Sequence, residues 1–180
     1  LHVRSRRQRQ MCIRDRNNAQ QIRDTFPVGN EGIRDLVGIA QHLGATIYTA
    51  PLEPAISGFI IKDPHSDPRI YINENESRVR QRFTLAHELG HLVERMQIAG
   101  DDDYSFVDHR KPGSYDLHEF FADEFAGALL MPSQKLRSME ENHLSVYEMA
   151  KQLGVSVSAV NKRLERLQTN PDAEGTATQD

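Results

Sequence analysis

The sequence predicts an α+β fold, in which a small, mostly antiparallel sheet precedes a series of helices. Three short segments between positions 45 and 73 are rich in β-branched and aromatic residues, which is typical of strands. From position 77 onward, apolar residues recur every three or four positions, as they do in amphipathic helices. With 180 residues the chain is long enough for one domain with a substantial hydrophobic core.

The composition excludes membrane-spanning and secreted classes of protein. No run approaches the 18 apolar residues that a transmembrane helix needs. The first residues are arginine-rich and lack the apolar segment of a secretory signal. The single cysteine, Cys12, cannot form a disulfide within the chain, which fits a reducing compartment. We therefore expect a cytoplasmic protein that makes no contact with a membrane.

Residues 1–16 differ from the rest of the chain in charge. They contain six arginines and one acid, a net charge of +5, whereas residues 17–180 contain 16 basic and 25 acidic residues, a net charge of −9. One interpretation is a disordered basic arm that binds nucleic acid or anionic lipid. We favour the other, a non-native segment, because RRQRQMCIRDR resembles translated sequencing-adapter sequence and residue 1 is Leu rather than Met. These residues are therefore left out of the fold prediction.

The first half of the remaining chain supplies one helix and the strands. A helix is expected over residues 31–43, with Gly44 as its stop signal. Pro64 and Pro68 mark a hairpin loop between the last two strands. Residues 98–115 are polar and acidic, and we expect a loop there. The strands are expected at residues 45–49, 57–62 and 69–73.

The second half is predicted to be helical. Ser77 is expected to cap a long helix that ends near Gln97. A second helix is expected from about Leu117 to Leu130, ending before a proline. Ser133 is expected to cap a shorter helix. The tail over residues 169–180 has the composition of a disordered segment.

The pattern His-Glu-x-x-His at residues 87–91 is the strongest chemical signal in the sequence. Residues four apart lie on one face of a helix, so His87 and His91 can reach the same metal ion. Glu88 lies beside them, where it can take a proton from a metal-bound water. The alternative is a chance pair of surface histidines. We favour a zinc site with one ion per chain, because the flanking residues are apolar and buried polar groups need partners.

A catalytic zinc ion needs a third protein ligand and an open position. Glu94 lies seven residues after His87, about 10.5 Å along a helix, which is too far for convergence on one ion. The longer metzincin pattern is absent, because Glu94 and Gln97 stand where glycine and histidine are required. Our candidate is Glu119, 28 residues after His91, near the start of the next helix.

Asp123 follows Glu119 by one helical turn and is expected on the same face. There it can accept the second N–H of a ligating histidine and fix the tautomer of that histidine. In the alternative interpretation, Glu119 forms a capping box with Asp116 and Asp123 is merely solvated. The otherwise apolar sequence of this helix favours the ligand interpretation.

Two segments together resemble the ImmA/IrrE family of metallo-endopeptidases: RQRFTLAHELGHL at residues 80–92 and E-x-x-A-D-x-F-A-x-x-L-L-M-P at residues 119–132. The resemblance extends from about residue 31 to 167 and includes the SGFI and RIYINEN segments of the expected sheet. It implies a zincin-like, gluzincin-type core in residues 17–142, with a small antiparallel sheet packed on the HExxH helix. It also implies that His87, His91 and Glu119 bind zinc and that Glu88 is the catalytic base. Asp123 stands where many members have asparagine.

The resemblance further implies a regulated protease that cleaves a DNA-binding repressor with a helix-turn-helix, of the phage, mobile-element or stress-response type, and so relieves repression. An oxyanion donor is expected, and the candidates are His109, Tyr115 and His118. The substrate is expected to lie as an extended strand along the sheet edge, with residues 57–62 or 69–73 as that edge.

Residues 143–168 are expected to form a helix-turn-helix-like unit. Gly154 would provide the tight turn between two short helices, and Ser156 could cap the second of them. Ala150 and Val160 occupy the positions at which the two helices pack.

This unit supports an alternative function, a DNA-binding regulator in which the zinc site is structural or sensory. The second helix has a basic side made by Lys162, Arg163 and Arg166. However, affinity for phosphates depends on net cationic contact, and residues 17–180 carry a charge of −9. We therefore favour the protease over direct DNA binding.

Overall fold

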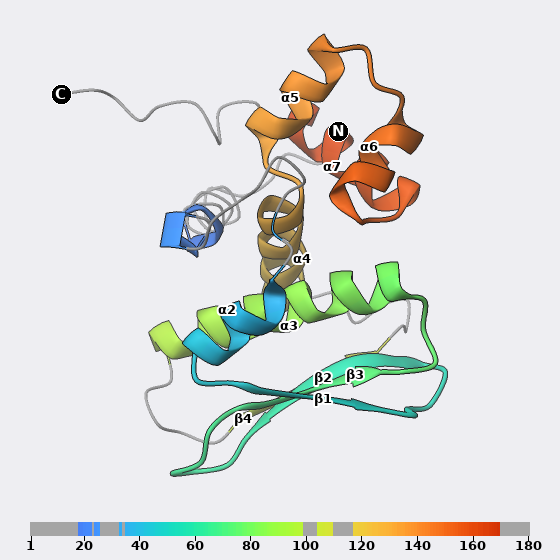
Figure 1. Cartoon of the computed structure of the whole chain (residues 1–180). Coiled ribbons are helices and arrows are strands. Elements are labelled where there is room, and N and C mark those ends of the chain that lie inside the picture. Colours follow the sequence, from blue (N-terminus) through green and yellow to red (C-terminus); the bar gives the residue numbers. More distant parts are fainter. Residues whose placement is uncertain are drawn as a thin grey trace, which may run out of the picture.

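The structure is a computed structural model that describes residues 18–22, 24–25, 33, 35–98, 104–109 and 117–169. The segment predicted at residues 1–16 lies outside these residues, as do positions 170–180 of the tail predicted at 169–180, whereas Thr169 is the last residue of a helix. The described part contains a four-stranded sheet with a long helix across one face, and further helices stacked beyond that helix (Figure 1). None of the helices in the described residues is both long and apolar enough to span a membrane.

The sheet is mixed, with the strand order β1-β3-β2-β4. β1 runs parallel to β3, and β2 runs antiparallel to both of its neighbours, β3 and β4. The strands are β1 (Thr46–Ala50), β2 (Ile56–Lys62), β3 (Arg69–Asn73) and β4 (Tyr104–His109).

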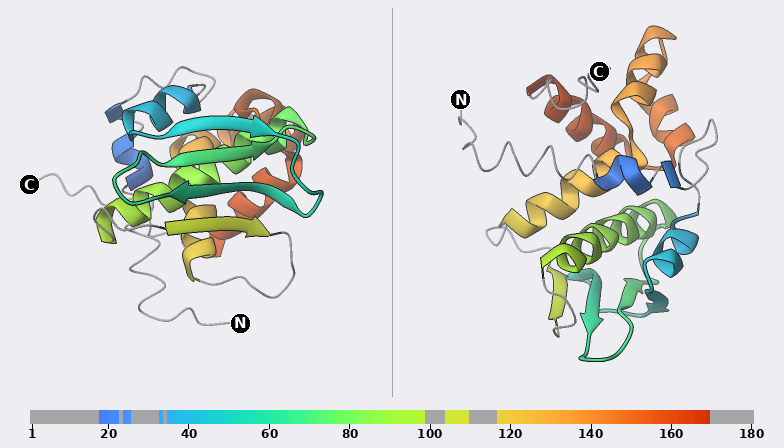
Figure 2. Two further views of the ribbon diagram at one scale, coloured as in Figure 1. Left: turned by 90° about the horizontal axis from the view of Figure 1, so that it is seen from below. Right: turned by 90° about the vertical axis from the view of Figure 1, so that its left-hand side faces the viewer.

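The structure differs from the predicted sheet in three respects. The expected loop at residues 98–115 contains strand β4, because an outer strand tolerates polar residues once its backbone is paired along one side. Two of the three pairings are antiparallel, as expected of a mostly antiparallel sheet, but β1 pairs in parallel with β3 and not with the strand that follows it in sequence. The two strands expected at the edge, β2 and β3, are the inner pair, and β1 and β4 are the outer strands (Figure 2).

Helix α3 (Arg78–Ile98) lies across one face of the sheet (Figure 1). Ile60, Ile70 and Ile72 are buried on β2 and β3 and belong to the same hydrophobic cluster as the apolar residues of α3. Gly58 permits a close approach, because an added Cβ there would lie 2.6 Å from the Thr84 side chain and 2.9 Å from the Tyr71 carbonyl oxygen. The helix that carries the HExxH pattern is therefore packed tightly onto β2.

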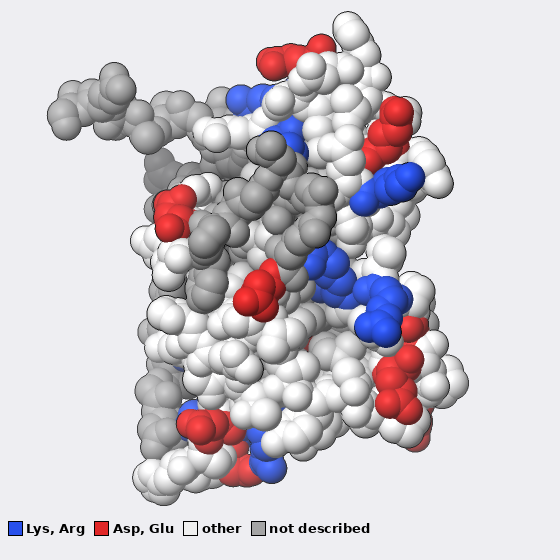
Figure 3. Space-filling model, in the orientation of Figure 1, with Lys and Arg blue, Asp and Glu red and all other residues white. Residues whose placement is uncertain are grey.

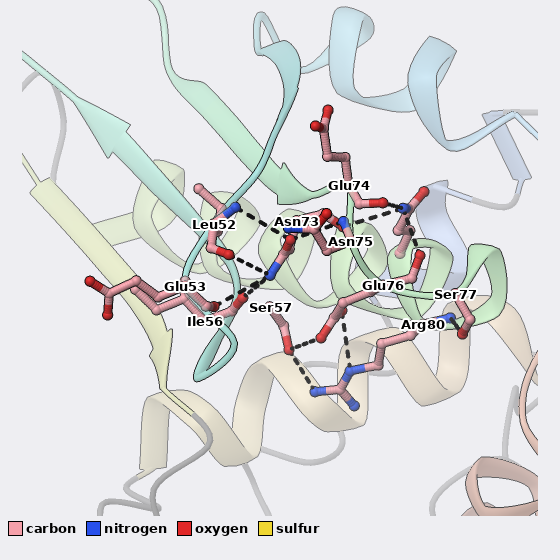
Figure 4. A network of polar contacts seen from close by, with 11 residues as sticks. Leu52, Glu53, Ile56, Ser57, Asn73, Glu74, Asn75, Glu76, Ser77 and Arg80 are labelled. Carbon is pink, nitrogen blue, oxygen red and sulfur yellow. Dashed lines mark hydrogen bonds and ion pairs between the residues drawn. The ribbon is translucent and has the colours of Figure 1, made fainter.

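A polar network fixes the start of α3 against the sheet (Figure 4). The Asn73 amide at the end of β3 donates to the Ile56 carbonyl at 2.8 Å. The buried Ser57 hydroxyl donates to Glu76 at 3.0 Å and accepts from Arg80 at 3.1 Å. This network ties the ends of β2 and β3 to the first turn of α3, so it limits where the helix can lie across the sheet.

The remaining helices lie near the predicted positions, although α2 begins at Leu36 and not at residue 31, because Asp35 caps it by accepting from the Gly38 backbone. Ser77 caps α3 by accepting a hydrogen bond from the Arg80 backbone at 3.3 Å. α5 departs from the prediction in one respect: Ser133 is its first helical residue and its N-cap is Pro132, without a side-chain capping bond. The other helices are α2 (Leu36–His42), α4 (Leu117–Leu130), α5 (Ser133–Glu141), α6 (Val146–Leu153) and α7 (Val157–Thr169).

Helices α6 and α7 form two short helices around a tight turn. Ser145 caps α6 through a capping box with Glu148. Gly154 ends α6 in the left-handed conformation, with φ of 64°, which glycine adopts at little cost. Ser156 accepts a hydrogen bond from the Ala159 backbone at 3.1 Å, as expected for the cap of the second helix.

Candidate metal centre

Helix α3 places His87 and His91 one turn apart on the same face. Both side chains are buried, with 5% and 1% of their surface exposed. The two Nε2 atoms lie 3.1 Å apart, and the rings are nearly perpendicular at 82°. The two nitrogens therefore converge on one point, as the four-residue spacing predicts.

Helix α4 brings a carboxylate to the same point. Glu119 Oε2 lies 3.4 Å from His87 Nε2, and Glu119 Oε1 lies 3.4 Å from His91 Nε2. The potential ligand atoms of these three residues all lie within 4.8 Å of one another, and among the described residues they form a group that could hold a metal ion. This placement is the one that the ligand interpretation of Glu119 expects, whereas Asp116, the partner of Glu119 in the capping-box interpretation, lies outside the described residues.

The close crossing of α3 and α4 depends on Gly90, between the two histidines. A Cβ added at Gly90 would lie 2.9 Å from Ala122 Cα, 3.2 Å from the Ala122 carbonyl oxygen and 3.2 Å from Phe125 Cβ. Backbone atoms cannot move aside as a flexible side chain can, so glycine is needed for this approach. The approach in turn carries Glu119, one turn before Ala122, to the histidines.

The donor set fits a tetrahedral divalent metal ion. Zinc lies about 2.0–2.2 Å from histidine nitrogens and carboxylate oxygens, so three of its ligand atoms at tetrahedral positions are about 3.3–3.5 Å apart. The separation of 3.1 Å between the two Nε2 atoms is close to these values, and each Nε2 lies 3.4 Å from a different oxygen of Glu119, so the carboxylate faces both imidazoles. Two imidazoles and one carboxylate also leave the fourth position open, as in catalytic rather than structural zinc sites.

Asp123 contacts the outer face of His87. The Nδ1 atom of His87 donates to Asp123 Oδ1 at 3.2 Å. Since Nδ1 is engaged in this contact, Nε2 is the ring nitrogen that faces Glu119 and His91. This is the geometry that the sequence predicted for Asp123, and such a contact fixes both the tautomer and the ring orientation of a ligating histidine.

Without a metal ion, the pKa values of His87, His91 and Glu119 are shifted in different directions. Burial by itself lowers the pKa of His87, but hydrogen bonds to Asp123 and Glu119, with the charge of Glu88, raise it to about 10. Burial lowers the pKa of His91, and a charged His87 lowers it further. Burial raises the pKa of Glu119, but its hydrogen bonds to both imidazoles bring it well below its usual range. The site therefore pairs a carboxylate with one imidazolium and one neutral imidazole.

Comparison with known proteins identifies the family. Residues 40–165 match the family model of the IrrE N-terminal-like domain, peptidase M78. The chain belongs to this family.

A solved structure described as a Mycobacterium tuberculosis transcriptional regulator shares the fold of this peptidase M78 domain, with a TM-score of 0.61 and 17% sequence identity. The match covers 92% of this chain and 49% of that one, so the chain spans about half the length of that regulator. No curated protein matches the sequence.

The other predicted site residues of this peptidase M78 domain are placed unequally. Glu88 is fully buried on α3. His118 lies next to Glu119, and its Nδ1 donates to the buried Glu94 at 2.9 Å. His109 lies at the end of β4, where its backbone pairs opposite Ile56, and its side chain lies outside the described part of the structure. Tyr115 lies outside the described residues altogether.

Sequence reasoning missed two features of the site. Sequence reasoning rejected Glu94 as a ligand but did not predict its contact with His118. The available indication was that Glu94 and His118 lie on the two helices that carry the expected ligands. Sequence reasoning also assigned Arg163 and Arg166 to the basic side of a helix that could bind DNA, whereas both form ion pairs with acidic residues of α4. Val160 was expected at a packing position and is buried, but nothing in the local sequence of α7 indicates that Arg163, one turn later, is buried as well.

Proposed function

We propose that this chain is a zinc-dependent endopeptidase that cleaves a DNA-binding transcriptional repressor and thereby relieves repression. The observation that carries the proposal is the convergence of His87, His91 and Glu119 on one point beside the buried Glu88. Membership of the peptidase M78 family supports peptide-bond hydrolysis. The repressor as substrate rests on the resemblance to the ImmA/IrrE endopeptidases.

In this proposal His87, His91 and Glu119 hold the metal, and Asp123 keeps Nε2 of His87 directed at it. When bound, zinc supplies Lewis acidity, which lowers the pKa of water and polarises the scissile carbonyl. Glu88 takes the proton from the attacking water and delivers it to the leaving amine. Its burial beside the ligands keeps bulk water away from the carboxylate and strengthens its electrostatic interactions.

The substrate is proposed to bind as an extended strand along β4. β2 and β3 are inner strands, so their backbone groups are already paired on both sides. β4 is an outer strand and lies on the same side of the molecule as the beginning of α4, which carries Glu119 (Figure 2). Addition of a strand at such an edge supplies main-chain hydrogen bonds to a peptide of any sequence.

His118 is the oxyanion-donor candidate whose side chain the structure describes. The buried Glu94 accepts from its Nδ1 and so orients the ring, while nearly half of the His118 side chain, 44%, remains exposed. A ring that is held by a carboxylate on one side and reaches solvent on the other can donate to a developing negative charge.

Direct DNA binding by α7 is the weaker candidate. Arg163 is buried and contacts Glu124, and Arg166 contacts Glu124 as well, so two of the three residues of the basic side are directed at α4. Lys162 is exposed. On the face shown in Figure 3, lysine and arginine side chains are mixed with acidic ones. Phosphate binding requires clustered cationic contacts.

The decisive test compares the wild type with Glu88→Gln. We expect both proteins to bind about one zinc ion per chain, as measured by elemental analysis, because an uncharged amide of the same size would not disturb the ligands. Only the wild type should cleave a co-expressed repressor encoded next to this gene, followed by immunoblot. A matched control, Glu140→Gln on the exposed side of α5, should cleave normally.

Equal cleavage by the wild type and Glu88→Gln would exclude Glu88 as the base. A wild type without zinc would exclude the metal site itself.

A further inference from the structure

The C-terminal helix α7 reaches the metal centre through one guanidinium group. Arg166 Nη1 contacts Glu124 Oε1 at 2.8 Å, and Arg166 Nη2 lies 3.6 Å from Asp123 Oδ2. The guanidinium carbon also lies 5.5 Å from the centroid of the Phe120 ring. All three partners lie on the first two turns of α4, directly after Glu119. One side chain of α7 thus contacts three residues in the part of α4 that carries the third ligand.

The same carboxylate connects Arg166 to the histidine ligand. Asp123 uses Oδ1 to accept from His87 and Oδ2 to contact Arg166. A carboxylate held at one oxygen can rotate about its Cβ–Cγ bond, whereas one held at both oxygens has a fixed plane. The chain of contacts Arg166–Asp123–His87 therefore spans three helices, α7, α4 and α3, and ends at the imidazole whose Nε2 faces the metal position.

We propose that Arg166 is a positioning residue of the metal centre, which acts by holding Asp123 in the orientation that fixes His87. This inference rests on the proposed metallopeptidase function. It gives the helix-turn-helix-like unit a role within the peptidase, because α7 holds in place the helix α4, which carries Glu119. Residues that hold a ligating histidine typically change metal affinity 10- to 100-fold when they are removed. Arg166 is one contact further from the metal, so we expect an effect of about tenfold.

The neighbouring residues of α7 provide matched controls. Arg163 lies one turn before Arg166 and also pairs with Glu124, at 3.6 Å. Its Nε also donates to the Met131 carbonyl at 3.3 Å, at the end of α4 that is far from Glu119. Lys162 is on the same helix and is exposed. If zinc affinity depends on the charge of α7 or on any contact that holds α7 to α4, substitutions of Arg163 and Lys162 should weaken zinc binding too. If the effect acts through Asp123, they should not.

The test measures zinc affinity of the full chain by competition with a chromophoric chelator. We expect Arg166→Met to weaken zinc binding about tenfold, Lys162→Met to leave it unchanged, and Arg163→Met to change it less than twofold. Arg166→Lys keeps one charge but cannot contact two carboxylates in a fixed plane. Arg166→Lys should therefore fold as the wild type does, measured by circular dichroism, but should bind zinc as weakly as Arg166→Met. In zinc-saturated protein, kcat should fall more than KM rises.

A double-mutant cycle decides whether the effect passes through Asp123. In an Asp123→Asn background, Arg166→Met should change zinc affinity by less than twofold, since the connection is already broken. An equal tenfold loss in both backgrounds overturns the proposal, as does wild-type zinc affinity in Arg166→Met and Arg166→Lys. Failure of the proposed function is distinguishable, because it appears as a wild type that binds no zinc or as unchanged cleavage by Glu88→Gln.

Discussion

At the scale of single residues, the contacts of His87 determine its protonation state and therefore how it can bind a metal ion. Its Nδ1 is held by Asp123 and its Nε2 faces Glu119, and together these contacts raise its pKa to about 10. In the metal-free protein His87 is therefore an imidazolium at neutral pH, with a second proton on its ring. Because the folded pKa is higher than the usual 6.5, this proton stabilises the metal-free fold fully below pH 6.5, and that stabilisation is lost as the pH rises towards 10.

A metal ion must displace this proton, since a ligating histidine is neutral. We predict that zinc binding at pH 7 releases about one proton per ion, and that apparent affinity rises by up to about tenfold per pH unit between pH 7 and 9. Calorimetric titrations in two buffers with different ionisation enthalpies would measure the released protons. Asp123→Asn removes a carboxylate that raises the pKa of His87, so it should release fewer. Binding without proton release in the wild type would contradict this account.

The residues of the site differ in how well the sequence predicts them. The two histidines and Glu88 follow from helix geometry alone, because residues four apart must share a face. Glu119 required only that a second apolar helix pack on the first. Arg166 could not be predicted in this role, since its partners lie on α4, more than 40 positions away, and depend on how α7 turns after Gly154. A basic side on a short helix looks the same in sequence whether it faces solvent or acidic side chains.

At the scale of elements, the crossing of α3 and α4 sets the site. We predict that Gly90→Ala lowers the free energy of unfolding, because overpacking against the backbone of Ala122 costs about 1–3 kcal/mol. This cost offsets or exceeds the ~1 kcal/mol that alanine gains over glycine in a helix. Zinc affinity should fall as well, since α4 must move away with Glu119. Urea denaturation followed by circular dichroism, in the presence of a chelator, would measure the first effect.

Gly127→Ala on α4 is the matched control. Its Cβ would meet only the Arg163 side chain, at an ordinary contact distance of 3.4 Å for the closest atom. We expect unchanged or slightly higher stability and normal zinc binding. If Gly90→Ala proves as stable as Gly127→Ala and binds zinc as well, the close crossing is not what positions Glu119.

The sheet shows where element-level prediction fails. Local alternation identified β2 and β3 and their hairpin, because both strands and the turn between them are contiguous in sequence. It could not identify the neighbour of β1, which pairs in parallel with the second strand after it. It also missed β4, whose polar surroundings resemble a loop and whose partner β2 lies more than 40 positions earlier. Pairing between distant segments is a property of the tertiary fold.

At the scale of the whole molecule, the helices after α4 are not a separate appendage. Leu136, Met149, Leu153 and Val160, from α5 to α7, are buried in the same hydrophobic cluster as Leu89 of the HExxH helix. The ion pairs between α4 and α7 add a polar connection across this junction. Helices α5 to α7 and the helices that carry the candidate metal ligands are thus parts of one packed structure.

Glu124 is the centre of that junction. Its side chain is 0% exposed, and it contacts Arg163 at 3.6 Å and Arg166 at 2.8 Å. We predict that Glu124→Gln lowers the free energy of unfolding by about 3 kcal/mol, because removal of one partner leaves the buried Arg163 guanidinium without its countercharge. Glu140→Gln, an exposed substitution of the same chemistry on α5, should change stability by less than about 0.5 kcal/mol.

Both variants are compared by urea denaturation with a chelator present, so that zinc binding adds nothing to the stability of the folded state. A loss close to that predicted means that the charge on Glu124 holds α7 against α4, and zinc affinity should then fall in the same variant, since Arg166 loses one of its two anchors. A loss below about 1 kcal/mol would mean that apolar contacts alone hold the junction, and that Arg166 must keep Asp123 in place without help from Glu124.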